Sequence, residues 1–274
     1  MQCFDRDHTR RVSVEKHIAS LNRKNKSWNM VGYCEVCEEA SAFLLDWAYA
    51  YDTPEGKMPN YRERIVCERC RLNNRQRFMA ARLMELVKDQ YSNSSSIYLH
   101  EHVTPFYKAI AAIPGANEVT GSEYLGHDKL PGQIIKGIRH EDATALSFND
   151  CSFDIVVSND VYEHVPDIEK ALKETCRVVK DGGMLMFSVP FHAGSSNTQQ
   201  RATMQGGVLT HLLPEQYHGN PVSAKGSLVF YDFGWDLLEM CRTAGFKDAH
   251  MLVYHSFMYG YLGQGLQYMF VAQK

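Results

Sequence analysis

Short apolar runs alternate with amphipathic stretches from about residue 94 to the end of the chain, and this alternation constrains the fold most. The predicted strands are residues 97–99, 118–121, 134–138, 153–158, 184–189, 251–254 and 267–271. Predicted helices occupy residues 73–90, 168–179 and 235–244. The run Ile155-Val156-Val157 has no polar alternation, as expected of a strand covered on both faces. The pattern predicts an α/β fold on an open, mostly parallel sheet.

Composition narrows the class of protein. The chain has 274 residues, with 29 Lys and Arg against 32 Asp and Glu, and 45% of its residues are hydrophobic. These values exclude a disordered chain and a uniformly basic nucleic-acid binder. No apolar run approaches the roughly 20 residues of a membrane-spanning helix, and the N-terminal segment has no apolar signal core. We therefore expect a cytoplasmic protein with no membrane partner.

Four of the eight cysteines form two Cys-x-x-Cys pairs, Cys34 with Cys37 and Cys67 with Cys70. Thiolates at this spacing form two turns that surround a tetrahedral Zn²⁺, and a site of four thiolates is closed and structural. An iron–sulfur cluster and reduced cysteines without a metal are the alternatives. We predict a structural zinc site.

The domain prediction follows from these two patterns. Residues 1–30 are a polar extension, residues 31–76 a zinc-binding module, and residues 77–274 the α/β domain. We expect residues 34–70 to be mostly loop.

Six arginines surround the second Cys pair. They are Arg62, Arg64, Arg69, Arg71, Arg75 and Arg77. They either present an anion-binding face to RNA or a phosphorylated substrate, or pair with nearby acids such as Glu63 and Glu68 or with the main domain. We favour local pairing.

An acidic residue follows each of the first four predicted strands. The residues are Glu101, Glu123, Asp142 and Asp160. In an open parallel sheet, ligands bind outside the carboxyl ends of the strands. Carboxylates there would repel a pyrophosphate, but they suit a ligand with ribose hydroxyls, an amino group and a positive centre. The chain also lacks the GxGxxG fingerprint and the Walker A loop.

The segment HEDATALSFNDCSFDIVVSNDVYEHVPDIEKALKETCRVVKDGGMLMFSVPF, residues 140–191, resembles class I S-adenosylmethionine-dependent methyltransferases of the methyltransferase domain 11 type. Within that superfamily the chain is similar to bacterial methyltransferases with an N-terminal Cys-x-x-Cys pair, over residues 34 to 272. The resemblance implies a Rossmann-like, mostly parallel seven-stranded sheet of the class I type, with a small N-terminal zinc-binding module and a cap insertion. It implies S-adenosylmethionine as the methyl donor, with structural Zn²⁺ as the second cofactor.

The same resemblance assigns the cofactor-binding residues. Glu123 would bind both ribose hydroxyls, and Asp142 with Ala143 would recognise the adenine. Tyr124 and Leu125 would flank the adenine ring. Asn159, Asp160 and Val161 would lie near the methionine moiety and the transferred methyl group.

The loop after the first strand departs from the superfamily pattern. An acid followed by Gly-x-Gly is usual there, because glycine lets the backbone approach the cofactor. Here Glu101 keeps the acid, but Val103 and Pro105 occupy the glycine positions. We expect that either this loop runs differently or the position of the cofactor shifts.

Residues 191–230 do not fit the strand–helix alternation. A long polar insertion at the carboxyl end of a strand is commonly a lid, so we expect a cap over the methyl acceptor. His218 and His192 lie in this segment and are the candidate catalytic bases.

The predicted reaction is methyl transfer to an oxygen or nitrogen of a small-molecule or carbohydrate-like acceptor. Two alternatives are an RNA methyltransferase that binds RNA with the zinc module, and a non-catalytic binding protein that keeps the fold but no longer binds the cofactor. The net charge of −3 and the lack of an extended basic stripe argue against RNA.

Overall fold

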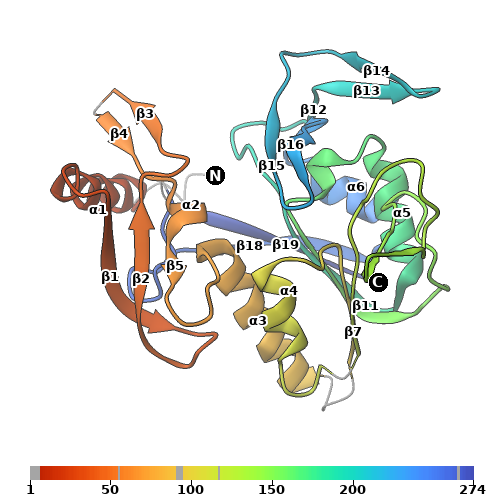
Figure 1. The fold of residues 1–274 in the computed structure, drawn as a ribbon, viewed down its shortest axis with the longest axis horizontal. Coiled ribbons are helices and arrows are strands. Elements are labelled where there is room, and N and C mark those ends of the chain that lie inside the picture. Colours follow the sequence, from red (N-terminus) through yellow and green to blue (C-terminus); the bar gives the residue numbers. More distant parts are fainter. Residues whose placement is uncertain (1–6, 55, 91–94, 117, 264–265) are drawn as a thin grey trace. The chain divides into compact units, whose positions relative to one another are not determined.

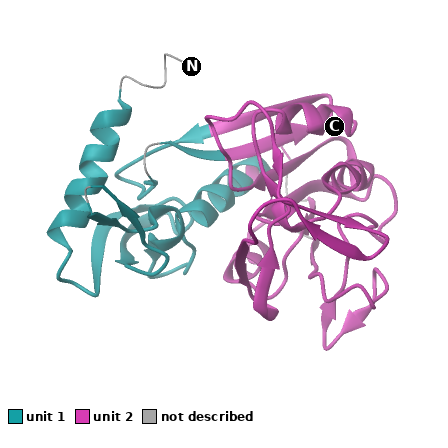
Figure 2. Cartoon of the chain, turned by 90° about the horizontal axis from the view of Figure 1, so that it is seen from above, with its two compact units in different colours: residues 1–86, 253–268 teal, residues 87–252, 269–274 magenta. Residues whose placement is uncertain are grey.

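The computed structural model describes residues 7–54, 56–90, 95–116, 118–263 and 266–274. Residues 1–6 of the predicted polar extension lie outside the described residues. The chain forms two compact units (Figure 2). Unit 1 comprises residues 1–86 and 253–268, and unit 2 comprises residues 87–252 and 269–274. The predicted boundaries at residues 30 and 76 stay a prediction.

Unit 1 is built on a small antiparallel sheet of β1, β2 and β5. Its strands are β1 (Ser27–Cys34), β2 (Glu39–Asp46), β3 (Tyr51–Thr53), β4 (Gly56–Met58) and β5 (Val66–Cys67). Its helices are α1 (His8–Leu21), α2 (Tyr61–Arg64) and the first turns of α3 (Asn74–Gln90). The expectation of a mostly looped segment at residues 34–70 is therefore wrong. In β2, Ser41, Phe43 and Leu45 alternate inward, and this two-residue period is typical of a half-buried strand.

Arg77 is fully buried in unit 1 and binds the C-terminal part of this unit. Its guanidinium donates hydrogen bonds to the backbone carbonyls of Tyr259 (2.5 Å), Gly260 (3.1 Å) and Ile65 (3.5 Å). It also lies 4.0 Å from the centre of the Phe43 ring. Arg77 thus joins residues 253–268 to the cysteine-containing sheet, although the two segments lie far apart in the sequence.

Unit 2 contains most of a six-stranded sheet, ordered β18-β19-β11-β10-β6-β7. Strands β7, β11, β18 and β19 of this sheet are labelled in Figure 1. The strands are β6 (Ser96–Leu99), β7 (Glu118–Gly121), β10 (Phe153–Asn159), β11 (Val179–Ser188), β18 (Asp248–Tyr254) and β19 (Gln267–Gln273). β7, β6, β10 and β11 pair in parallel, and β19 is antiparallel to β11. The helices are α4 (Pro105–Ala111), α5 (Ile168–Val178), α6 (Leu237–Thr243) and the 3₁₀ helix η2 (Tyr162–His164). This confirms a Rossmann-like, mostly parallel sheet.

The predicted strand at residues 134–138 does not join this sheet, so the described sheet has six strands instead of the expected seven. β8 (Ile134–Ile135) and β9 (Ile138–Arg139) form a separate hairpin. Lys136 and Gly137 connect them, with φ of +52° and +81°. Two consecutive residues with positive φ make the tight turn that folds a chain back antiparallel. After this hairpin, His140 forms an isolated parallel bridge with Glu123, which follows β7.

Residues 191–230 form short strands instead of a helical layer. They are β12 (Gln199–Gln200), β13 (Ala202–Gln205), β14 (Val208–His211), β15 (Tyr217–Asn220) and β16 (Ser223–Leu228). β13 pairs with β14 and β15 with β16, while β12 pairs with β17 (Tyr231–Asp232). The role of this segment as a cap stays a prediction. Among the described residues, no helix combines the length and the apolar character needed to cross a bilayer.

Candidate functional site

The order of the strands locates a binding edge. The chain runs from β6 to its neighbour β7 and returns to β10 on the other side of β6. The connections therefore diverge between β6 and β10, and an open parallel sheet binds ligands at the carboxyl ends of such a strand pair. Glu101 follows β6 and Asn159 ends β10, so both lie at this point.

Glu101 and Asn159 contact one another directly. The Asn159 amide Nδ2 donates to Glu101 Oε1 at 2.8 Å, and Thr104 Oγ1 donates to Glu101 Oε2. Asn159 Oδ1 is buried and has no hydrogen-bond partner among the residues that the structure describes. A buried acceptor without a partner is costly. It can be satisfied by a ligand that brings an N–H donor, such as an ammonium group, to this edge.

Glu123 is held by the loop that follows β6. Its Oε1 accepts hydrogen bonds from the backbone amides of His102 (2.8 Å) and Val103 (3.0 Å). For Oε2, the described part of the chain provides no partner. The backbone amides of this glycine-free loop thus bind the Glu123 carboxylate. One carboxylate oxygen remains to accept hydrogen bonds from a ligand.

Gly121 allows the close approach that this loop requires. A Cβ at this position would lie 2.6 Å from the Glu101 carbonyl oxygen and 2.5 Å from the Tyr107 ring. Real Cβ atoms do not approach so closely, so a side chain here would push the loop and α4 away from the end of β7. Gly121 therefore allows the loop after β6 and α4 to pack against the end of β7.

The predicted adenine-binding residues gather beside Glu123. The backbone amide of Glu141 donates a hydrogen bond to the Glu123 carbonyl oxygen at 3.2 Å. Asp142 Oδ1 accepts from the amide (2.8 Å) and the hydroxyl (2.7 Å) of Thr144. These bonds fix a turn in which Ala143 is half-buried.

Tyr124 and Leu125 follow Glu123 in the chain, and both contact His140. The Leu125 amide donates to His140 Nδ1 at 2.9 Å. The Tyr124 ring is 53% exposed, with its centre 5.5 Å from that of the His140 ring. An exposed ring beside a fixed polar turn is suited to stacking on a planar base. His140 was not predicted, and its role as a support is visible only once the chain is folded.

Asp160 has a strained backbone at the end of β10. Its φ is +51°, which is uncommon for a residue other than glycine. The Asp160 amide donates to the Ser188 carbonyl (2.9 Å), and its Oδ1 accepts from the Ser188 hydroxyl (2.8 Å). Ser188 at the end of β11 thus holds the carboxylate in place. Val161 follows and leads into η2.

The two candidate bases have different carboxylate neighbours. His192 is exposed, with Nε2 3.8 Å from Asp232 Oδ1. His218 lies in β15, with Nδ1 3.6 Å from Oε1 of Glu163, a fully buried residue of η2. Burial raises the pKa of the Glu163 carboxyl, while His218 acts in the opposite direction. Glu163 was not predicted as a site residue, because an acid in a polar Glu-His sequence is usually exposed.

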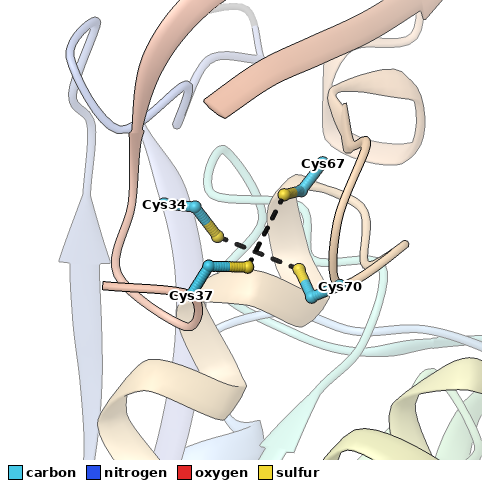
Figure 3. A group of neighbouring side chains, drawn as sticks. All are labelled: Cys34, Cys37, Cys67 and Cys70. Atoms are coloured by element: carbon cyan, nitrogen blue, oxygen red, sulfur yellow. Dashed lines mark hydrogen bonds between the residues drawn. The ribbon is translucent and has the colours of Figure 1, made fainter. Parts of the chain in front are cut away.

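The four cysteines of the predicted metal site converge in unit 1 (Figure 3). Their sulfurs all lie within 4.8 Å of one another. The Cys34–Cys70 and Cys37–Cys67 separations are 3.8 and 3.9 Å. A disulfide requires about 2.05 Å, whereas sulfurs bound at about 2.3 Å around a tetrahedral metal lie about 3.8 Å apart. The spacing therefore fits zinc coordination.

Burial and the neighbouring thiol of Cys34 raise the pKa of the Cys37 thiol to about 12. The Ser41 hydroxyl lies 3.2 Å from the Cys67 sulfur, where it can donate a hydrogen bond to a thiolate. Four thiolates in so small a volume need a cation to balance their charge. The donor set and its packing thus agree with a closed structural site.

Most of the arginines near the second Cys pair are engaged. Arg62 and Arg75 pair with Glu63, Arg64 with Asp46, and Arg69 with Glu39. Arg77 is buried, as described above. These pairs agree with the favoured expectation of local pairing, and they neutralise much of the charge that an RNA backbone would need.

The sequence and the structure were compared with known proteins. Residues 117–187 match the family model described as a methyltransferase domain. A protein of Encephalitozoon cuniculi named as a methyltransferase is 30% identical over 116 residues, which cover 41% of this chain and 53% of the relative. A demethylmenaquinone methyltransferase of Staphylococcus aureus is 37% identical over 81 residues, covering 27% of this chain and 34% of the relative.

Among solved structures, an S-adenosylmethionine-dependent methyltransferase from Mesorhizobium loti is similar, with a TM-score of 0.46 and 16% identity. The match covers 72% of this chain and 98% of that one. The chain spans about half the length of the first curated relatives it matches. Residues 117–187, which match the methyltransferase domain family, include Glu123, Asp142 and Asp160 of the binding edge.

Proposed function

We propose that the protein is a methyltransferase that binds S-adenosylmethionine at the carboxyl ends of β6, β7 and β10. The carrying observation is the Glu101–Asn159 pair where the connections diverge, with a buried Asn159 Oδ1 that has no partner within the described part of the chain. The family match over residues 117–187 gives independent support. Attack on a sulfonium methyl group needs both reactants held in line, which binding across one sheet edge can provide.

Each part of the donor has a proposed partner. Glu123 Oε2 accepts from the ribose hydroxyls. Asp142 and the amide of Ala143 recognise the adenine, and Tyr124 and Leu125 flank it. On the other side, Asn159 Oδ1 accepts from the amino group. The carboxylates of Glu101 and Asp160 favour the positive charges of the donor, and Val161 borders the methyl group.

The binding edge is tested by calorimetric titration with S-adenosylmethionine. Glu123→Gln retains Oε1 for the loop amides but removes the negative charge that strengthens the ribose contact. A hydrogen bond to a charged group contributes about 1.5–3 kcal/mol, so affinity should fall about tenfold or more. Glu239→Gln, an exposed substitution on α6, is the control and should leave affinity unchanged. If wild type fails to bind at millimolar concentrations, a non-catalytic binding protein becomes the better account.

The proposed acceptor is a small or carbohydrate-like molecule methylated on oxygen or nitrogen. The Staphylococcus aureus relative is named for a small-molecule acceptor, which supports this class. The local pairing of the arginines weighs against RNA. A salt-dependent gel shift with RNA would overturn this choice.

We also propose that Cys34, Cys37, Cys67 and Cys70 hold one structural zinc ion. Zinc would fix the two Cys-containing turns of unit 1 and supply folding free energy. Elemental analysis of wild type and Cys151→Ser should find one zinc per chain, since Cys151 is an exposed cysteine outside the cluster. Cys67→Ser should lose it. Iron, or no metal, in freshly purified wild type would contradict the assignment.

For a hydroxyl acceptor, a proton must leave as the oxygen attacks the methyl carbon. We propose that the insertion presents His218, or else His192, to the acceptor. His218 is favoured because a buried carboxylate lies beside its Nδ1. His218→Ala should lower turnover by about 10²–10⁴ with donor affinity unchanged. Full turnover in both His218→Ala and His192→Ala would refute acceptor activation by these histidines.

A further inference from the structure

Three side chains of types that can bind a metal converge in unit 2, whereas the four cysteines belong to unit 1. They are Glu163 and His164 of η2 and His218 of β15. Glu163 Oε1 lies 3.6 Å from His164 Nε2 and 3.6 Å from His218 Nδ1. Each residue offers one ligand atom, and these three atoms all lie within 4.8 Å of one another. Residues from two distant parts of the sequence therefore meet around a single point.

The two imidazoles differ in the state of the nitrogen that faces Glu163. His164 Nδ1 is 2.8 Å from the carbonyl oxygen of Leu228, so Nδ1 carries the proton and Nε2 keeps its lone pair. His218 Nε2 is 3.2 Å from the side-chain amide nitrogen of Gln216, which can donate to it. In that tautomer His218 Nδ1 carries the proton, which a metal ion would displace on binding. A metal-binding histidine is typically fixed through its other ring nitrogen in this way.

The separations are too long for direct hydrogen bonds between Glu163 and the two imidazoles, and they are compatible with a shared cation. Hydrogen bonds from nitrogen to oxygen are 2.7–3.2 Å long, and 3.6 Å is too long for one. Adjacent ligand atoms bound at about 2.0–2.2 Å around an octahedral or tetrahedral metal lie about 2.8–3.6 Å apart. Glu163 is fully buried, and buried carboxylates require a cation, a metal or a proton.

We propose that Glu163, His164 and His218 form a second metal site, which binds one divalent first-row transition metal ion. Two imidazoles and one carboxylate leave coordination positions open for further ligands. Asp160, whose charge acts on Glu163, lies three residues before it at the end of β10. Oxygen atoms of the acceptor, such as the hydroxyls of a carbohydrate-like molecule, would occupy the open positions.

A metal ion in this position lowers the pKa of a bound hydroxyl, so it would replace a free imidazole base in acceptor activation. This role in acceptor binding rests on the proposed methyl transfer, whereas metal binding by the three side chains does not. His218 then acts as a metal ligand, so the proposed activation of the acceptor requires the metal ion.

The test is a titration with Mn²⁺ of the full chain that carries a single zinc ion per molecule, followed by electron paramagnetic resonance. Mn²⁺ prefers oxygen and nitrogen ligands and does not compete for four thiolates. We expect one Mn²⁺ per chain, and binding about tenfold or more weaker in His218→Ala. His211→Ala, in the same insertion and paired with Glu215, is the matched control and should bind as wild type does.

Glu163→Gln provides the second variant, with circular dichroism to verify that each protein is folded. No Mn²⁺ binding by wild type at millimolar concentrations would overturn the proposal, as would binding unaffected in both variants. Calorimetry with S-adenosylmethionine on the same samples separates the two proposals. If Mn²⁺ binds and the donor does not, the metal site stands and the methyl-transfer proposal falls.

Discussion

Acid is expected to destabilise unit 2 through His100. This side chain is 9% exposed, and its ring lies 4.8 Å from that of Tyr98 and 5.7 Å from that of Tyr162, centre to centre. Its Nε2 is buried without a hydrogen-bond partner among the described residues. Burial lowers the pKa of His100 to about 4, whereas an exposed histidine has a pKa of about 6.5.

The sign of the effect follows from proton binding. Between about pH 6.5 and pH 4, the unfolded chain binds a proton that folded His100 does not, so the free energy of unfolding falls as the pH falls. The pKa difference corresponds to a loss of about 2 kcal/mol between pH 7 and pH 5. Urea unfolding followed by circular dichroism should detect it.

His100→Phe keeps an aromatic ring against Tyr98 and Tyr162 but removes the titrating group. The variant should lose about 2 kcal/mol less than wild type over the same pH interval. The comparison cancels the contributions of other groups, such as His255, whose pKa is also lowered by burial. Equal losses in the two proteins would refute the assignment of a buried neutral imidazole.

Three further predictions concern the internal packing of each unit. Arg77→Met should lower the free energy of unfolding by about 2–5 kcal/mol, because it leaves buried carbonyls without donors, while the exposed Arg69→Met should cost less than about 1 kcal/mol. Gly121→Ala should cost about 1–3 kcal/mol, measured by urea unfolding, because its Cβ would overlap the Tyr107 ring. Chelation of zinc should change the fluorescence of Trp28, which packs against the cysteine-containing core; unchanged emission after complete zinc removal would contradict a structural role.

The sequence predicted those parts of the fold that depend on long apolar runs. The strands at β6, β7, β10, β11, β18 and β19 and the helices α3, α5 and α6 were all expected near their observed positions. The prediction of one strand at residues 134–138 was wrong, because Lys136-Gly137 forms a turn with positive φ at both residues. A Gly-containing pair between two isoleucines was the available signal. β2 was missed because small residues weaken its apolar alternation.

The candidate site was predictable only where its residues follow strands. Glu101, Glu123, Asn159 and Asp160 gather because the ends of parallel strands meet at one edge. The use of the loop amides to hold Glu123 was not predictable, because it depends on the path of a loop without glycines. The contact between Glu163 and His218 was not predictable either, because the two residues are 55 positions apart and the contact depends on how the insertion folds back.

A crystal structure with S-adenosylhomocysteine tests the central claim most directly. We predict the ribose within hydrogen-bond distance of Glu123, the adenine beside Asp142 and Tyr124, and the amino group on Asn159 Oδ1. Binding of the ligand elsewhere in the chain, or an edge that stays free of ligand at millimolar concentration, would contradict the account.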